Sequence, residues 1–269
     1  MDYFCKWLLI LKFHRYRDVP IASGCWVNVT SASSRRMVLY FYLMQQSLRI
    51  NKISLSEKPT LRLVHISDIH YKGDKQSLIS LITQIDKIRP DLVCFTGDLA
   101  SSTRTATEAL DLIANLSCPI YGVPGNHDLR IYMNLKNAPE RFEATGGKWL
   151  VNQTAELSGR SAFISGAKGK STSWIPSNLP GIHILLVHYP KFVYNLGNRK
   201  FDLILAGHSH GGQIRFPGIG APFMPYGIGK YGYGLFKTPN GSLYVTSGVG
   251  TSVIPFRLNC PPEIALIEL

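Results

Sequence analysis

Negatively charged side chains, cysteines and long apolar runs are all scarce in this sequence. Among its 269 residues, 17 are Asp or Glu and 29 are Lys or Arg, so the formal net charge is +12. Such an excess predicts affinity for anions, and it fits phosphates, nucleic acid and acidic membrane surfaces equally well.

The five cysteines are scattered, and none belongs to a C-x-x-C pair. Their odd number and their spacing argue against a disulfide framework and a thiolate zinc site, and they fit a reducing compartment. Because no run of about 20 apolar residues occurs, a transmembrane helix is not indicated. The hydrophobic content of 45% instead indicates a globular protein.

Residues 1–60 are predicted to be a basic, partly apolar appendage. They hold nine Lys or Arg and three Asp or Glu, and bases flank the apolar stretches Trp7–Leu11 and Met37–Ile50. Such segments can lie on an anionic bilayer, and a poorly ordered arm is the alternative. We therefore expect a domain at 61–269 that is peripheral to a membrane, with the cytoplasmic face favoured. Export is a second option, because Arg35-Arg36 precedes an apolar segment.

Strands and helices alternate through the first half of this domain. The apolar spacing predicts strands at 61–66, 91–95 and 119–123, and helices at 77–88, 106–116 and 132–145. This order implies a parallel sheet, with ligands gathered at the carboxyl ends of its strands. The second half is predicted to hold strands at 149–157, 161–166, 182–187, 202–206, 213–216, 231–237, 242–246 and 264–268. Two sheets packed face to face, with helices outside, follow from this pattern.

Five predicted strands are followed directly by side chains that can bind metals. The groups are Asp68-x-His70, Gly97-Asp98, Gly125-Asn126-His127-Asp128, His188 and Gly207-His208-x-His210. Each group alone is weak, because an Asp after a strand is usually a turn or cap residue and a lone histidine is usually structural. Together they would crowd carboxylates on one rim, a cost that two divalent cations remove. The set therefore predicts a two-metal hydrolytic centre.

This ordered set of motifs resembles the calcineurin-like metallophosphoesterase family over the whole of residues 61–269. The resemblance implies an α/β fold of four layers, α/β/β/α, in which two mixed sheets are flanked by helices. It also implies a ligand set: Asp68, His70 and His210 for the first metal, Asn126, His188 and His208 for the second, and Asp98 bridging both.

The catalytic pair implied by the resemblance is His127, which would face the substrate, and Asp128, which would orient it. As an imidazolium, His127 would stabilise developing charge or protonate the leaving oxygen, and a carboxylate partner would raise its pKa. Asn126, Gly212 and Gln213 complete the expected substrate contacts, because glycines let the backbone come close. A simple turn is the alternative explanation of the glycines.

The expected cofactors are two divalent metal ions. Oxygen and nitrogen ligands without a thiolate suit Mn²⁺, Fe, Zn²⁺ or Co²⁺, and we favour Mn²⁺. Two such ions lower the pKa of a bound water and clamp phosphoryl oxygens. The stretch 214–234, rich in Gly, Pro and aromatic residues, would form an apolar wall beside them, or else a hairpin that closes the core.

Within the family, the basic N-terminus, the aromatic stretch and the run 207–214 resemble one bacterial branch. It holds membrane-associated phosphodiesterases and UDP-2,3-diacylglucosamine pyrophosphate hydrolases. We favour the latter activity, which gives a lipid phosphate and UMP in lipid A synthesis, with an anionic lipid-linked substrate at a membrane surface. The alternatives are a broad phosphodiesterase acting on nucleotides or surface polymers, and a non-enzymatic metal-binding scaffold. We expect no specific nucleic-acid binding, because no aromatic-basic stacking motif occurs.

Overall fold

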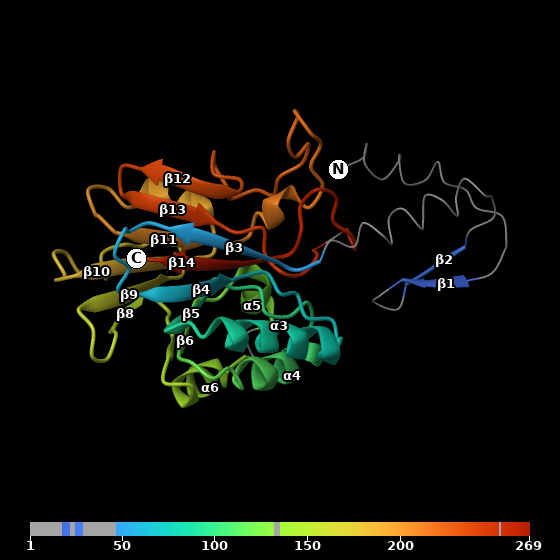
Figure 1. The fold of residues 1–269 in the computed structure, drawn as a ribbon, viewed down its shortest axis with the longest axis horizontal. Coiled ribbons are helices and arrows are strands. Elements are labelled where there is room, and N and C mark those ends of the chain that lie inside the picture. Colours follow the sequence, from blue (N-terminus) through green and yellow to red (C-terminus); the bar gives the residue numbers. More distant parts are fainter. Residues whose placement is uncertain (1–17, 22–24, 29–46, 132–134, 253) are drawn as a thin grey trace. The chain divides into compact units, whose positions relative to one another are not determined.

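The protein divides into two compact units, Met1–Gln45 and Gln46–Leu269. The computed structural model in Figure 1 describes residues 18–21, 25–28, 47–131, 135–252 and 254–269. In the first unit, β1 (Asp18–Ile21) pairs antiparallel with β2 (Cys25–Asn28).

Most of the segment expected to contact a membrane lies outside the described residues. This holds for Trp7–Leu11 and for all but the last few residues of Met37–Ile50. Within the described ranges, no helix has both the length and the apolar character needed to cross a bilayer.

Two six-stranded sheets form the second unit. The first sheet has the order β3 (Arg49–Ser54), β14 (Glu263–Glu268), β4 (Arg62–Ile66), β5 (Leu92–Phe95), β6 (Ile120–Gly122) and β7 (Lys148–Trp149). The second has the order β12 (Gly234–Thr238), β13 (Gly241–Val245), β11 (Leu203–Ala206), β10 (Ile182–Val187), β9 (Ala162–Ala167) and β8 (Gln153–Glu156). Each sheet combines parallel and antiparallel pairs, so both are mixed.

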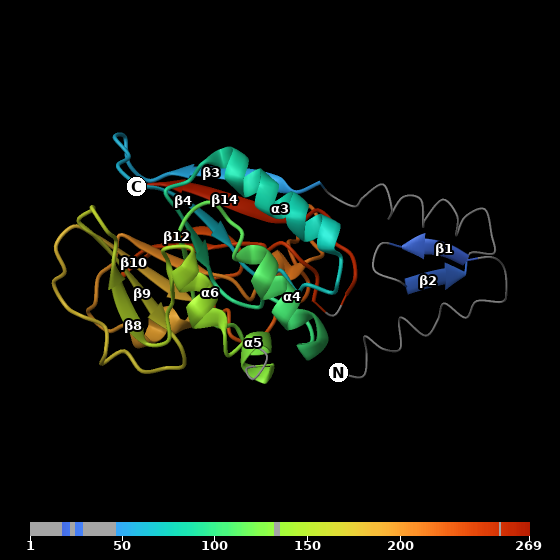
Figure 2. The same ribbon diagram turned by 90° about the horizontal axis from the view of Figure 1, so that it is seen from below.

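Three apolar layers hold the sheets and helices together. Helices α3 (Lys75–Ile88), α4 (Thr103–Ile113) and α6 (Ala138–Ala144) pack on the outer face of the first sheet (Figures 1 and 2). A second core, including Leu63 and Leu205, lies between the sheets. The outer face of the second sheet is covered by the 3-10 helix η2 (Pro190–Asn195) and by loops. The predicted four-layer α/β fold is therefore confirmed.

The second unit begins earlier than residue 61, the boundary expected from the sequence. Strand β3 pairs in parallel with β14 along its whole length, from Arg49 opposite Glu263 to Ser54 opposite Glu268. The polar stretch after β3 resembled a linker, but it is the turn that leads from this edge strand into β4. The end of the expected appendage therefore belongs to the folded unit.

Two other expected elements are divided in the structure. The helix expected at 132–145 is replaced by a short helix, α5 (Asn126–Arg130), and by α6. The strand expected at 149–157 becomes β7 in the first sheet and β8 in the second. The chain changes sheets around Asn152, which adopts a left-handed φ of 56° and whose side chain accepts the Lys168 N–H. The predicted strand is thus interrupted by a turn at an asparagine, a residue type that tolerates the left-handed conformation.

The strand expected at 213–216 is replaced by a loop that makes only isolated bridges, between Ile214 and Leu258 and between Phe216 and Gly220. Strands β4, β5 and β6 run parallel in the first sheet, and β10 and β11 run parallel in the second. Their carboxyl ends carry the predicted ligands.

Candidate metal centre

The loops after β4, β5, β6, β10 and β11 meet at one rim of the two sheets. Backbone hydrogen bonds join them, from the Asp68 N–H to the Gly97 carbonyl at 2.8 Å and from the Gly207 N–H to the His188 carbonyl at 3.2 Å. A Cβ on Gly207 would lie 1.9 Å from Ser67 Oγ. Only glycine therefore lets the β4 and β11 loops approach so closely.

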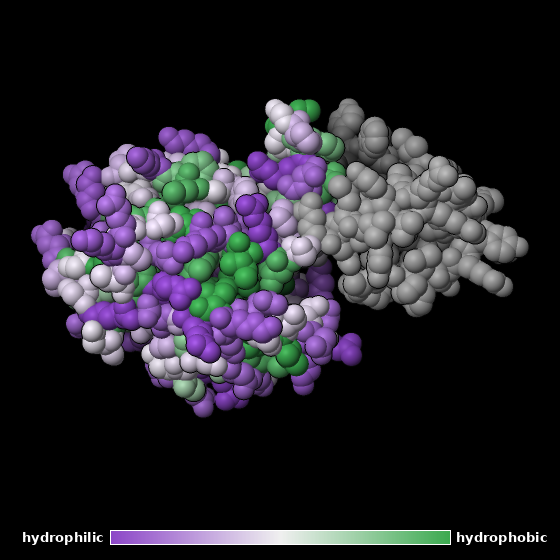
Figure 3. Space-filling view, in the orientation of Figure 1, coloured by the Kyte–Doolittle hydropathy of each residue, from purple (hydrophilic) through white to green (hydrophobic). Residues whose placement is uncertain are grey.

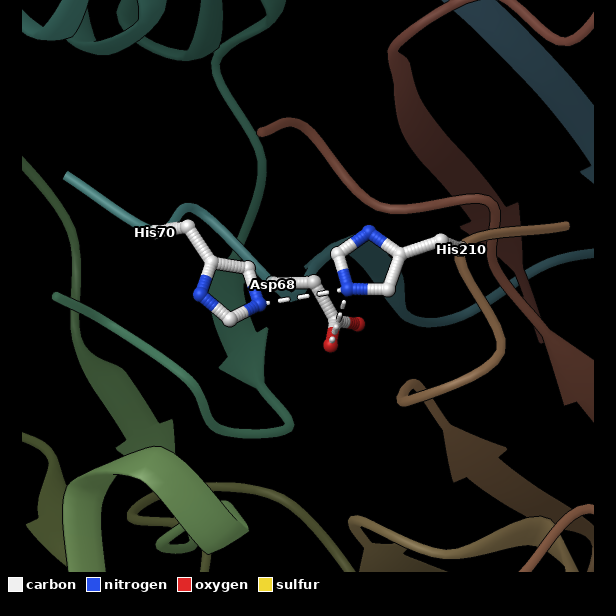
Figure 4. Close-up of side chains that lie close together, drawn as sticks. All are labelled: Asp68, His70 and His210. Atoms are coloured by element: carbon white, nitrogen blue, oxygen red, sulfur yellow. Dashed lines mark hydrogen bonds and ion pairs between the residues drawn. The ribbon is translucent and has the colours of Figure 1, made fainter. Parts of the chain in front are cut away.

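A first cluster consists of Asp68, His70 and His210, whose side chains point toward one another in Figure 4. The Nε2 atoms of His70 and His210 are 3.2 Å apart, and His210 Nε2 is 3.6 Å from Asp68 Oδ1. All three residues are buried, with exposed fractions of 0%, 3% and 7% in sequence order. Asp68 Oδ1 receives no hydrogen bond from the described residues.

A second cluster consists of Asn126, His188 and His208. His188 Nδ1 donates to the Thr96 carbonyl at 2.7 Å, and His208 Nε2 donates to the Tyr226 carbonyl at 2.7 Å. The other ring nitrogens therefore present lone pairs to the centre. His188 Nε2 lies 3.0 Å from Asn126 Oδ1 and 3.1 Å from His208 Nδ1.

Asp98 lies between the two clusters. Its Oδ2 is 3.5 Å from His70 Nε2 and 3.6 Å from His188 Nε2, so one oxygen faces an imidazole from each side. Its Oδ1 accepts the His127 N–H at 2.8 Å. This is the position expected of a bridging carboxylate.

The donor atoms fit two metal ions. Neighbouring ligands held at about 2.0–2.1 Å around an ion lie about 2.8–3.4 Å from one another in octahedral or tetrahedral geometry. The separations within the two clusters run from 3.0 to 3.6 Å. Facing lone pairs repel when nothing lies between them, and a cation makes the same contact attractive. All seven predicted ligands are therefore brought together in a dinuclear arrangement without a thiolate.

The pKa values of the site keep most of its imidazoles neutral, as metal binding requires. Burial lowers the pKa of His70 to about 3 and that of His210 to about 4, and burial with the nearby His188 lowers that of His208 to about 4. Burial raises the pKa of Asp98 to about 7. Burial by itself raises the pKa of Asp68, but the surrounding imidazoles outweigh burial and lower this pKa. The site thus presents unprotonated imidazole nitrogens beside two carboxyl groups, the donor set that a metal ion binds.

The backbone at the ligands is strained. Five of the seven predicted ligands have a positive φ, between 45° and 65°: Asp68, His70, Asp98, His208 and His210. The left-handed region costs a residue with a side chain about 1 kcal/mol or more. Non-glycine residues adopt it mainly where surrounding structure imposes it, and such residues cluster at functional sites.

His127 lies beside the first cluster and is half-buried. Its ring meets that of His70 edge-on, with centroids 4.7 Å apart. We expected a carboxylate to raise its pKa, but burial and the nearby Arg130 lower it. The substrate-free site therefore holds a neutral imidazole that can donate a hydrogen bond to a bound oxygen.

The role expected for Asp128 is wrong. Its Oδ2 accepts the backbone N–H groups of Asp98 and Gly125, and its Oδ1 accepts that of Leu99. Adjacent helical residues do not face each other, and no hydrogen bond joins this carboxylate to the His127 imidazole within the described chain. Asp128 instead fixes the backbone that carries the bridging Asp98.

The substrate contacts expected for Gln213 and Gly212 are also not supported. The Gln213 amide is buried, donates to the carbonyls of Ile254 and Phe256, and accepts the Ser252 N–H. A Cβ on Gly212 would lie 2.3 Å from that of Ala221. Both residues therefore hold neighbouring loops in place.

Sequence reasoning missed Tyr189, and it placed Tyr226 in the apolar wall expected at 214–234 without a contact to a ligand. The Tyr189 ring lies 4.4 Å from that of His208 and 5.1 Å from that of His188, centroid to centroid. The Tyr226 carbonyl fixes the tautomer of His208, as partners behind a metal ligand commonly do. Tyr189 directly follows the predicted ligand His188, and this position could have indicated it. The contact between Tyr226 and His208 is not indicated by any pattern in the sequence.

Arg257 was missed as well. The residue is 6% exposed, and its guanidinium donates to the carbonyls of Ser247, Gly248 and Gly250, and also to those of His210 and Cys260. The segment 247–250 in turn contacts the β4 loop, because the Gly250 N–H donates to the Asp68 carbonyl at 2.7 Å. Arg257 therefore supports the first cluster from behind.

Comparison with known proteins agrees with the geometry. A family model described as calcineurin-like phosphoesterase matches residues 61–212. Phosphodiesterase YaeI of Escherichia coli K12 is 31% identical over 225 residues, which cover 77% of this chain and 82% of the relative. Two uncharacterized proteins of Bacillus subtilis 168 are each 28% identical. YpbG aligns over 90% of this chain and 95% of its own, and the metallophosphoesterase YkuE over 77% and 78%.

Proposed function

Because the chain belongs to the calcineurin-like phosphoesterase family, and is thus a metal-dependent phosphoester hydrolase, we propose that it cleaves phosphodiester or pyrophosphate bonds at the candidate metal centre. The observation that carries this proposal is the position of Asp98 Oδ2 between His70 Nε2 and His188 Nε2. Mn²⁺ is the proposed ion, because the ligand set is oxygen and nitrogen only.

Each residue of the metal centre would have a distinct role in hydrolysis. When bound, two cations supply Lewis acidity and lower the pKa of a water molecule. Asp68, His70 and His210 would hold one ion, Asn126, His188 and His208 the other, and Asp98 both. His127 would donate a hydrogen bond to a non-bridging or leaving oxygen, where charge develops as the phosphorus–oxygen bond breaks. Asp128 keeps the Asp98 loop rigid through backbone amides.

UDP-2,3-diacylglucosamine is our proposed substrate, with the cytoplasmic membrane surface as the place of action. Two features support it. The net charge of +12 suits an anionic pyrophosphate, and large apolar side chains stand exposed near the second cluster, among them Tyr189 and Tyr226. A broader phosphodiesterase is the second candidate, favoured by the printed name of the Escherichia coli relative.

The test is a substrate panel with purified full-length protein, stripped by chelator and reloaded with Mn²⁺. We expect hydrolysis of bis(p-nitrophenyl) phosphate, little hydrolysis of p-nitrophenyl phosphate, and release of UMP from the diacylated sugar nucleotide. If the last stays intact while the diester is cleaved, the lipid substrate is wrong and the broader phosphodiesterase stands. Faster cleavage of the monoester than of both other compounds would overturn the reaction class.

A further inference from the structure

The loop of residues 214–230, between η3 (His210–Gly212) and β12, exposes an unusual amount of apolar surface. We call it the apolar loop. The three most exposed large hydrophobic side chains of the described chain lie on it: Tyr226 at 86%, Ile219 at 80% and Phe223 at 63%, joined by Phe216 at 44%. Figure 1 shows the loop projecting from the second unit, and Figure 3 shows apolar residues at its tip.

The apolar loop is held in shape despite its exposure. Phe216 and Gly220 exchange backbone hydrogen bonds of 2.8 Å in both directions, which closes a small hairpin at the tip. At the base, the Arg215 N–H donates to the Leu258 carbonyl at 2.9 Å. Three prolines, at 217, 222 and 225, restrict the backbone further. The apolar side chains are thus presented with little conformational freedom left to lose on binding.

The charged side chains of the segment that contains the apolar loop have one sign. No Asp or Glu occurs between Asp202 and Glu263, whereas Lys and Arg occur four times in that interval. Lys191 adds a further base, with its Nζ 4.9 Å from the Tyr226 ring centroid and 3.4 Å from its hydroxyl. Arg215 lies 5.5 Å over the Tyr233 ring. A projecting apolar tip above basic side chains is complementary to an anionic lipid surface.

The apolar loop is also joined to the metal centre. The Tyr226 carbonyl accepts the His208 Nε2–H at 2.7 Å. A Cβ on the next residue, Gly227, would lie 2.5 Å from the Tyr189 ring, which itself packs on His208. Whatever the loop binds is therefore held close to the second cluster.

We propose that the apolar loop seats in the surface of an anionic lipid bilayer and so presents the metal centre to phosphoesters at the headgroup level. Ile219 and Phe223 enter the acyl boundary, Tyr226 lies at the headgroups, and Lys191, Arg215 and Lys230 face the lipid phosphates. The site of action named here builds on the proposed function, but the docking itself does not require hydrolysis.

The first test measures binding of the full chain to sucrose-loaded vesicles by sedimentation. With vesicles that contain phosphatidylglycerol, the double variant Ile219→Gln/Phe223→Gln should bind at least about tenfold more weakly than wild type, because two apolar side chains no longer leave water. The control is Ile79→Gln, which removes an exposed apolar side chain from α3, outside both the apolar loop and the N-terminal segment, and should bind like wild type. Wild-type binding should weaken with added salt and on pure phosphatidylcholine.

The second test measures depth. In Phe223→Trp, lipids brominated on their acyl chains should quench more tryptophan fluorescence than they quench in the wild type. In Ile79→Trp, the quenching should not exceed that of the wild type. Wild-type binding by the loop double variant, or no extra quenching of Phe223→Trp, would overturn the proposal and assign any membrane contact to other residues. Hydrolysis of bis(p-nitrophenyl) phosphate, a soluble diester, should be unchanged in the loop variants. It reports on the proposed function separately.

Discussion

The two halves of the metal centre are built differently. The inner half, formed by Asp68, His70 and His210, is buried and supported from behind by Arg257. In the outer half, Asn126 and His208 are only half-buried. Tyr189, 39% exposed, and the apolar loop adjoin that half. The inner half depends on the packing of the protein, whereas the outer half faces the side from which a substrate arrives.

Removing the group common to both halves should have the largest effect. In Asp98→Asn, the carboxylate that faces both clusters becomes an amide of the same size, so neither half keeps its full charge. We expect kcat for a diester to fall at least about a thousandfold. The metal content, measured by elemental analysis, should fall with it. Near-wild-type activity at full metal load would show that Asp98 does not bridge.

Arg257→Met should disturb the inner half alone. Losing the guanidinium leaves several buried carbonyls without donors, so the free energy of unfolding should fall by about 3 kcal/mol. Chemical denaturation of the metal-free protein measures this. Arg257→Lys, which keeps a charge but fewer donors, should recover only part of the loss. An unchanged midpoint in Arg257→Met would mean that packing alone holds the inner half.

Tyr189→Ala should disturb the outer half alone. The ring that packs on His188 and His208 is lost, so the affinity for one of two Mn²⁺ ions should fall about tenfold, as it does when partners behind metal ligands are removed. Calorimetric titration of Mn²⁺ should then separate two binding steps. Tyr189→Phe keeps the ring and should behave like wild type. A loss of affinity at both steps would contradict the division into halves.

His65 belongs to neither half and lies behind the centre, with its Nε2 2.8 Å from Thr96 Oγ1. Burial lowers its pKa from 6.5 to about 3. Below pH 6.5 the unfolded chain binds the proton first, so His65 makes stability fall as the pH drops toward 3, by up to about 1.4 kcal/mol per unit. Above pH 6.5 it has no effect. His65→Gln should show a shallower decline in denaturation midpoints between pH 6.5 and 5; an identical decline would assign it to other groups.

The sequence predicts the inner and outer ligands equally well, because ligand position follows from a local pattern. Asp68, His188 and His208 each lie one or two residues beyond an apolar strand, and parallel strands bring such positions to one edge. The same reasoning gave the two packed sheets. His65 and His183 instead lie inside strands, where both are buried and hydrogen-bonded, to Thr96 and to Ser165.

What the sequence could not predict depends on contacts across long separations. Asp128 binds backbone amides about 30 positions away, and the Gln213 amide binds carbonyls about 40 positions away. Neither partner is a side chain, so residue types give no hint of the contact. Strand β3 was read as part of an appendage because its partner β14 is more than 200 residues distant. Edge strands with exposed polar faces carry little apolar signal of their own.

The left-handed backbone at five ligands has a consequence for how the protein tolerates mutation. At His70, glycine would relieve the conformational cost and at the same time delete a ligand. A metal-free variant that lacks the ligand can therefore be more stable to heat than the metal-free wild type. Heat challenge of a metal-free variant library, sorted only for survival, would enrich chains that have lost hydrolysis. At these five positions, the free energy of folding favours glycine, whereas hydrolysis requires the ligand. Only selection for activity therefore retains both the fold and the metal centre.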